Sequence, residues 1–67
     1  MAELPLAPLK RILKRAGGER VSDKAAEALR DEIEDRALEL SKSAKKHAKH
    51  AKRKTIQRED VRAANRR

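Results

Sequence analysis

The apolar residues between Ser22 and about Lys52 recur at every third or fourth position, and no glycine or proline interrupts them. This spacing aligns them along one face of a helix. Such a helix would extend for roughly 45 Å, farther than a chain of this size can wrap into a core of its own. The pattern therefore predicts a long central helix that is shared with a partner. Its apolar face consists of Ala25, Leu29, Ile33, Ala37, Leu40, Ala44, Ala48 and Ala51.

A shorter amphipathic helix is predicted before the central one. Residues 4–8 contain two prolines, which suit the entry and the first turn of a helix. Gly17 and Gly18 can end the helix, because glycine readily adopts a left-handed C-cap. The residues on its apolar face are Leu6, Leu9, Ile12 and Leu13.

A third helix is predicted from Gln57 to about Asn65, with acidic residues in its first turn and Val61 and Ala64 on its inner face. Extended links of residues 19–21 and 52–56 separate the three helices. The expected order is short helix, strand-like loop, long helix, strand-like loop and short helix, which is an all-α fold.

Charge is unevenly distributed along the central helix. Acids outnumber cations between Asp23 and Glu39, whereas Lys42 to Lys54 carries only positive charge. Both trends suit the helix dipole, and Ser22 is a favourable N-cap.

Composition limits the chain to one domain over residues 1–67. It has no aromatic residue, no cysteine and only twelve leucines, isoleucines and valines. So thin a core favours dimerisation, and a disulfide framework or a thiolate zinc site is excluded. No apolar run has the length of a signal peptide or a membrane span, so we expect a soluble intracellular protein.

A formal net charge of +8 on 67 residues indicates a polyanionic partner. Readers of single strands and RNA loops use aromatic side chains for stacking, and this chain has none. Double-stranded DNA is therefore the favoured partner, and no cofactor is expected.

Other interpretations of the same residues were weighed. The run from Lys42 to Lys54 is, in isolation, typical of a solvated helical face, and a basic amphipathic helix can also lie on an anionic membrane. His47 and His50 provide two ligands of a metal site, with Asp60 as the third. No residue pattern for a nucleophile and its base, and no glycine-rich phosphate loop, supports an enzyme.

Three groups of motifs stand in order along the chain. They are Glu3-Leu4-Pro5-Leu6-Ala7-Pro8, Ala16-Gly17 with Glu19-Arg20-Val21-Ser22, and His50-Ala51 with Arg53-Lys54-Thr55-Ile56 and Glu59-Asp60-Val61. With this spacing, the sequence resembles an archaeal histone over nearly its whole length. The resemblance implies a histone fold, a "handshake" homodimer, and wrapping and compaction of double-stranded DNA in nucleosome-like or extended hypernucleosome-like particles. It also implies a cytoplasmic protein associated with the chromosome, with paralogous histones as further partners.

The resemblance assigns DNA contacts to both loops and to the first helix. Arg20 would enter the minor groove and contact Thr55 of the partner subunit, and a salt bridge between Arg53 and Asp60 would hold the second loop in shape. The implied DNA-binding residues are Lys10, Arg11, Lys14, Arg20, Val21, Ser22, Arg53, Lys54 and Thr55.

Assembly residues follow from the same resemblance. The dimer core would contain Leu29, Ile33, Leu38 and Leu40, and Gly17 would let stacked dimers approach. The contact between dimers would involve His47, His50, Asp60 and Ala63.

The sequence departs from the family pattern at five positions. Lys52 replaces a glycine, so a left-handed turn there would cost about 1 kcal/mol. Polar or small residues replace apolar ones elsewhere, at Arg36, His47, Ala63 and Asn65. A histone-fold subunit of a heterodimeric regulatory or interaction complex is the alternative function, although such a subunit would not need cations in both loops.

Overall fold

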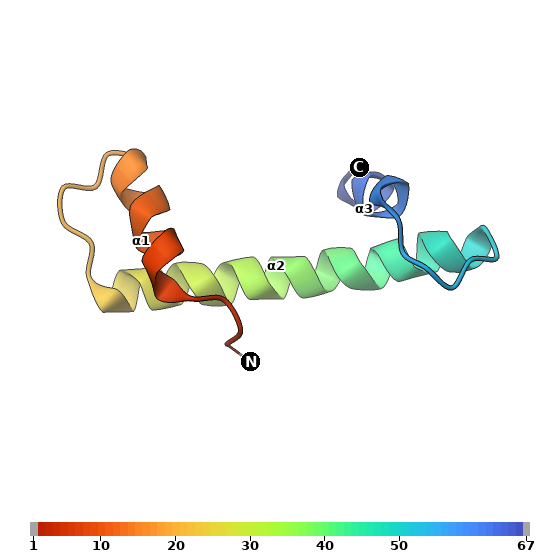
Figure 1. Cartoon of the computed structure of the whole chain (residues 1–67), viewed down its shortest axis with the longest axis horizontal. Helices are drawn as coiled ribbons and strands as arrows, with labels where there is room; N and C mark the ends of the chain where they lie inside the picture. The colour runs from red at the N-terminus through yellow and green to blue at the C-terminus, as the bar shows by residue number, and fades with distance from the viewer. Residues whose placement is uncertain (1, 67) are drawn as a thin grey trace. The chain divides into compact units, whose positions relative to one another are not determined.

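The computed structural model describes residues 2–66, which form three helices and no strand (Figure 1). The helices are α1 (Leu6–Arg15), α2 (Asp23–His50) and α3 (Arg58–Asn65). The predicted all-α pattern of a short, a long and a short helix is confirmed. The chain forms two compact units, residues 1–35 and 36–67, and α2 runs from the first into the second.

The first unit contains α1 and the beginning of α2. Pro5 occupies the N-cap of α1, and α1 ends where the N–H groups of Gly17 and Gly18 donate to carbonyls of the last turn. Gly17 has φ 110°, a left-handed conformation that favours glycine. Leu9 is buried at 6% exposure, whereas Ile12 of the same predicted face is 52% exposed.

The start of α2 is capped as predicted, since Ser22 Oγ accepts a hydrogen bond from the N–H of Ala25 at 3.0 Å. The apolar face is placed slightly differently from the prediction. Ala26, and not Ala25, is fully buried in the first unit, with Leu29 and Ile33 half-buried beside it along the helix.

An N-terminal arm precedes α1. The backbone N–H groups of Glu3 and Leu4 both donate to Glu34 Oε2, at 2.6 and 2.7 Å. These bonds lower the pKa of the Glu34 carboxyl, because they favour its charged form. The arm is thus held to α2 through its backbone.

The second unit contains the rest of α2 and all of α3. Ala44 and Ala48 are 0% and 2% exposed, and Leu40 is half-buried. Gln57 caps α3 in a reciprocal capping box with Asp60, one residue before the helix begins. Val61 lies 44% exposed, so its predicted place on the inner face is wrong for the single chain, and Asp60, Ala63 and Ala64 turn inward instead.

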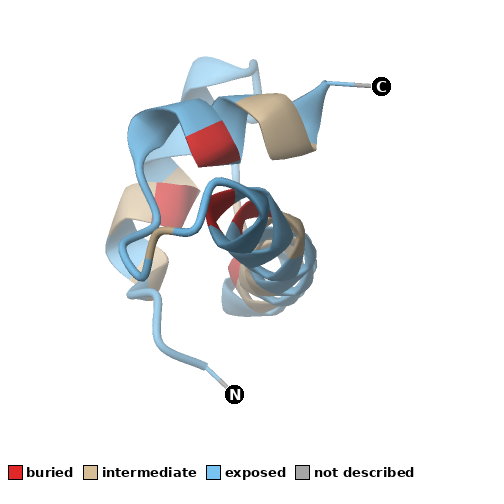
Figure 2. Ribbon diagram, turned by 90° about the vertical axis from the view of Figure 1, so that its right-hand side faces the viewer, coloured by how far each residue is buried: buried red, intermediate tan, exposed pale blue. Residues whose placement is uncertain are grey.

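Large apolar side chains are scarcely buried anywhere in residues 2–66 (Figure 2). The buried side chains are Leu9, Ala26, Ala44, Ala48 and Asp60. Most of the stabilisation that apolar burial gives a folded domain is therefore missing from one chain alone.

Candidate nucleic-acid interface

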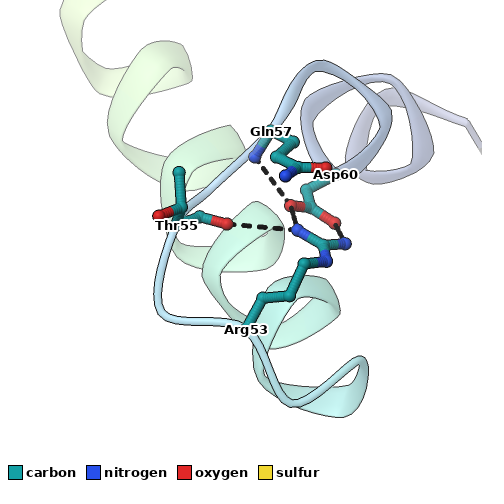
Figure 3. A network of polar contacts seen from close by, with 4 residues as sticks. All are labelled: Arg53, Thr55, Gln57 and Asp60. Atoms are coloured by element: carbon teal, nitrogen blue, oxygen red, sulfur yellow. Dashed lines mark hydrogen bonds and ion pairs between the residues drawn. The ribbon is translucent and has the colours of Figure 1, made fainter.

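The second loop, residues 51–57, is held in shape by one buried carboxylate (Figure 3). Arg53 Nη1 and Nη2 donate to the two oxygens of Asp60, each at 2.8 Å, which is a bidentate salt bridge. Arg53 Nη1 also donates to the carbonyl of Thr55 at 3.1 Å, and the N–H of Gln57 donates to Asp60 Oδ2 at 2.8 Å. The guanidinium thus connects both sides of the loop to α3.

The electrostatics of this pair favour its charged form. The hydrogen bonds from Arg53, and then that from Gln57, lower the pKa of Asp60 to about 2. The pKa of Arg53 is raised by its bond to Asp60. Asp60 is only 3% exposed, so its charge is compensated where it is buried.

The loop begins in a left-handed turn. Lys52 has φ 58°, while the N–H groups of Lys52 and Arg53 donate to the carbonyls of Lys49 and Ala48 at 2.9 Å. This is the C-terminal turn that the family usually makes with glycine, and here lysine adopts it. Lys54 and Thr55 follow with exposed side chains.

The first loop places Arg20 on an exposed bend, two residues before the cap of α2. Val21 is half-buried and Ser22 is used in capping. Arg20 forms no ion pair with any other described residue. Its guanidinium is therefore available to an external anion.

The three cations proposed on α1 are not equivalent. Lys10 pairs with Asp23 in the first turn of α2, whereas Arg11 and Lys14 are exposed and make no such pair among residues 2–66. This pair was not foreseen, because nothing in the sequence alone brings α1 beside residue 23. The positive charge of Lys10 is partly compensated within the chain.

The net positive charge of the chain resides in one unit. Residues 1–35 contain seven lysines and arginines against eight acids, whereas residues 36–67 contain twelve against three. Such asymmetry is typical of a surface that faces a polyanion.

Residues 2–64 match the family described as histone-like transcription factor (CBF/NF-Y) and archaeal histone. Two curated relatives are one of the subunits of archaeal histone HAN1 from Thermococcus zilligii and Probable archaeal histone 3 of Methanocaldococcus jannaschii. Each is 53% identical over 64 residues, covering 96% of this chain and 96% of the relative. The chain belongs to the archaeal histone family.

Membership confirms the histone fold that the motifs predicted, and it identifies a structural chromatin protein that is not an enzyme. Within residues 2–66, no helix has the length and apolar character needed to cross a membrane. No three acidic, histidine or cysteine side chains of the described part lie close enough together to hold a metal ion.

Two departures from the archaeal histone pattern contact each other. Arg36 Nη2 donates to Asn65 Oδ1 at 3.2 Å, and Arg36 Nη1 lies 3.6 Å from Glu39 Oε2. The spacing of three residues could have predicted the pair with Glu39. The bond to Asn65 could not be predicted, because it depends on how α3 packs.

The proposed contact between dimers remains a prediction. His47 and His50 are exposed, His47 adds a small electrostatic contribution to the lowered pKa of Asp60, and Ala63 is half-buried. Both oxygens of Asp60 already accept bonds within the chain, so His50 of a neighbouring dimer would have to use a remaining lone pair. Gly17 is exposed, with open space beside its Cα.

The four dimer-core residues differ in position. Leu29, Ile33 and Leu40 are half-buried along one face of α2. Leu38 is 57% exposed, and its separation of two residues from Leu40 puts it on the other side of the helix. The structure therefore gives no support to Leu38 as a core residue.

Proposed function

We propose that this archaeal histone binds double-stranded DNA without sequence preference, wraps it and compacts it on the chromosome. The observation that carries the proposal is the second loop, in which the Arg53–Asp60 bridge fixes a backbone that presents Lys54 and Thr55 to solvent. Fixed donors lose little entropy when they meet a phosphate. The concentration of positive charge in the same unit supports this assignment.

Little base specificity is expected of such an interface. Lysine and threonine at a loop contact phosphate, and Arg20 suits a narrow minor groove, where A·T and T·A pairs look alike. Preference should follow the bendability of the duplex. Affinity should fall with salt by a log-log slope of about 0.9 per phosphate contact.

The binding form is proposed to be a homodimer. One chain buries Leu9 as its only large apolar side chain among residues 2–66, and leaves Leu29, Ile33 and Leu40 partly exposed along α2. Antiparallel pairing of two α2 helices would cover these residues. It would also set the acidic half of each α2 against the basic half of the other, which favours a two-fold arrangement.

Assembly beyond the dimer is proposed to occur on DNA. The contact around His47 and Ala63 lacks large apolar side chains, so it is weak in free solution. A duplex that holds two dimers side by side raises their effective concentration.

The alternative is a subunit that pairs with a different chain, such as a paralogous histone. The Thermococcus zilligii relative is itself named as one subunit of a histone. Sedimentation of the purified protein distinguishes the two, because a chain that needs a different partner would not form a stable dimer alone.

Nuclease digestion of complexes on long duplex DNA at low salt tests the proposed function. We expect protected fragments, in a ladder if assembly is extendable and of one size if the particle is closed. The matched variant Arg20→Ala with Lys54→Ala should give little protection at the same concentration. No protection by the unmodified protein would refute wrapping, and a strong preference for one sequence at fixed salt would refute nonspecific binding.

A further inference from the structure

Four lysines form a continuous row on the last part of α2, in positions that the loop interface does not use. Lys42, Lys45, Lys46 and Lys49 are all exposed. Their spacing of three and four residues places them on one side of the helix. We call this row the lysine face.

The lysine face is turned away from α3. Ala44 and Ala48, which alternate with these lysines in sequence, are buried on the side of α2 that α3 covers (Figures 1 and 2). Leu40, a proposed dimer-core residue, precedes Lys42 by two positions and therefore lies on the other side of the helix. Neither α3 nor the proposed dimer partner would cover the lysine face.

Its charge is not compensated within the described chain. None of the four lysines forms an ion pair with another residue of 2–66. Like charges at spacings of three and four destabilise a helix, so the row opposes folding. The row continues into a hollow at the end of α2 that is lined by Lys46, Lys49, His50 and Lys52.

The second loop points elsewhere. Arg53 turns back to Asp60 of α3, on the side of α2 opposite to the lysine face (Figure 3). Duplex DNA has a persistence length of about 150 base pairs, so one duplex cannot turn around a single helix to reach both sides. The loop and the lysine face therefore address different segments of polyanion.

We propose that the lysine face binds a second DNA duplex, so that the protein bridges two duplexes in addition to holding one through its loops. The proposal rests on the proposed function, since the loops must hold the first duplex. Lysine is a flexible point charge that meets phosphates regardless of sequence. No aromatic residue is present for stacking on single strands, and no large apolar side chain between residues 42 and 49 would anchor an acidic peptide.

A two-duplex capture assay tests this proposal. One duplex is fixed to beads, protein is bound, and the retention of a second, labelled duplex is measured. The test variant combines four changes in the lysine face, and a charge-matched control neutralises four exposed cations outside every proposed contact. The test changes are Lys42→Gln, Lys45→Gln, Lys46→Gln and Lys49→Gln, and the control changes are Arg15→Gln, Lys24→Gln, Arg58→Gln and Arg62→Gln.

The two variants should bind a single duplex with Kd values within about twofold of each other. The lysine-face variant should capture at least tenfold less labelled duplex than the control. Capture by the unmodified protein should fall roughly 100-fold between 50 and 200 mM salt beyond the loss of single-duplex binding, as four phosphate contacts predict. Sedimentation without DNA should give equal masses, which separates bridging from joining of dimers.

Three results would overturn the inference while leaving the proposed function intact. They are undiminished capture by the lysine-face variant, a much weaker single-duplex affinity of that variant than of the control, and retention of labelled polyglutamate as strong as that of the duplex. The second would place the face in the first-duplex site, and the third would assign it to an acidic protein. Failure of the unmodified protein to bind any duplex would instead refute the proposed function.

Discussion

Asn65, the last residue of α3, accepts a hydrogen bond from Arg36 of α2 at 3.2 Å. Both residues stand where the archaeal histone pattern usually has apolar side chains. A polar pair thus joins the end of α3 to α2 where packing would otherwise do so. The Arg36 side chain is 44% exposed, which limits the strength of the bond.

Arg36→Ala and Asn65→Ala should each reduce stability by less than about 1 kcal/mol, and the double variant should lose less than the sum, because the two changes remove one interaction. Urea denaturation at fixed protein concentration measures this coupling. Glu39→Ala is the control, since it removes the other partner of Arg36 and leaves Asn65 in place. Strictly additive losses would mean that the bond contributes no coupling.

The pKa of Asp60 makes stability depend on acid pH. Its folded value of about 2 lies below the ordinary value of 3.8. The charged carboxylate therefore stabilises the fold above about pH 4, and this contribution is lost as the pH falls toward 2. Asp60→Asn should lower the Tm at neutral pH, with a deficit that narrows between pH 4 and 2. Circular dichroism melts would contradict the assignment if the deficit stayed constant over that interval.

Dimerisation predicts that thermal stability rises with protein concentration. An isolated chain should be largely unfolded, because it buries few large apolar side chains. Each tenfold increase in concentration should add about 1.4 kcal/mol to the stability of a dimer. A Tm that does not change with concentration, together with a monomer mass in sedimentation, would be incompatible with the homodimer.

Arg20 should contribute more to DNA affinity than any other single cation. A weakly hydrated guanidinium gains more in the concentrated negative potential of a narrow minor groove than an ammonium gains at an open phosphate. Arg20→Ala should weaken binding roughly tenfold, and Lys42→Ala about twofold, at the same salt concentration. Titration of a labelled duplex compares them, and equal losses would show that Arg20 acts only as one charge among many.

The contact between dimers should be strengthened by apolar side chains. Burial of one leucine contributes on the order of 2 kcal/mol, so His47→Leu with Ala63→Leu should produce tetramers without DNA. Lys46→Leu is a matched control that adds an apolar side chain away from the contact. Sedimentation decides the outcome: tetramers of the unmodified protein, or a dimeric double variant, would mean that the contact is misplaced.

Protonation of the histidines provides a further check on the same contact. His47 and His50 have ordinary pKa values near 6.5, so lowering the pH toward 6 adds like charge where two dimers would meet. The tetramer fraction of the double variant, which keeps His50, should fall over this range.

Much of the fold could be predicted because it depends on local sequence. The period of apolar residues marked α2, Ser22 marked its start, and the glycines at 17 and 18 marked the end of α1. Lys52 was expected to bear a left-handed conformation from its position alone, and it does. These features depend on backbone geometry and on neighbours a few residues away.

The register of the buried face and the long-range polar contacts could not be predicted. Ala25 and Ala26 fit the helical period almost equally well, and only the packing of the first unit decides that Ala26 is buried. Val61 was expected inside, but Asp60 takes that direction because Arg53 holds it there. Partners that are distant in sequence carry no signal in a single chain.

The attachment of the N-terminal arm implies an unusual pattern of mutational tolerance. Glu34 grips the arm by the N–H groups of residues 3 and 4, which every amino acid except proline possesses. The side chains at these two positions can therefore diverge freely without loosening the attachment. The restriction falls on position 34, thirty residues away, where a carboxylate must be kept.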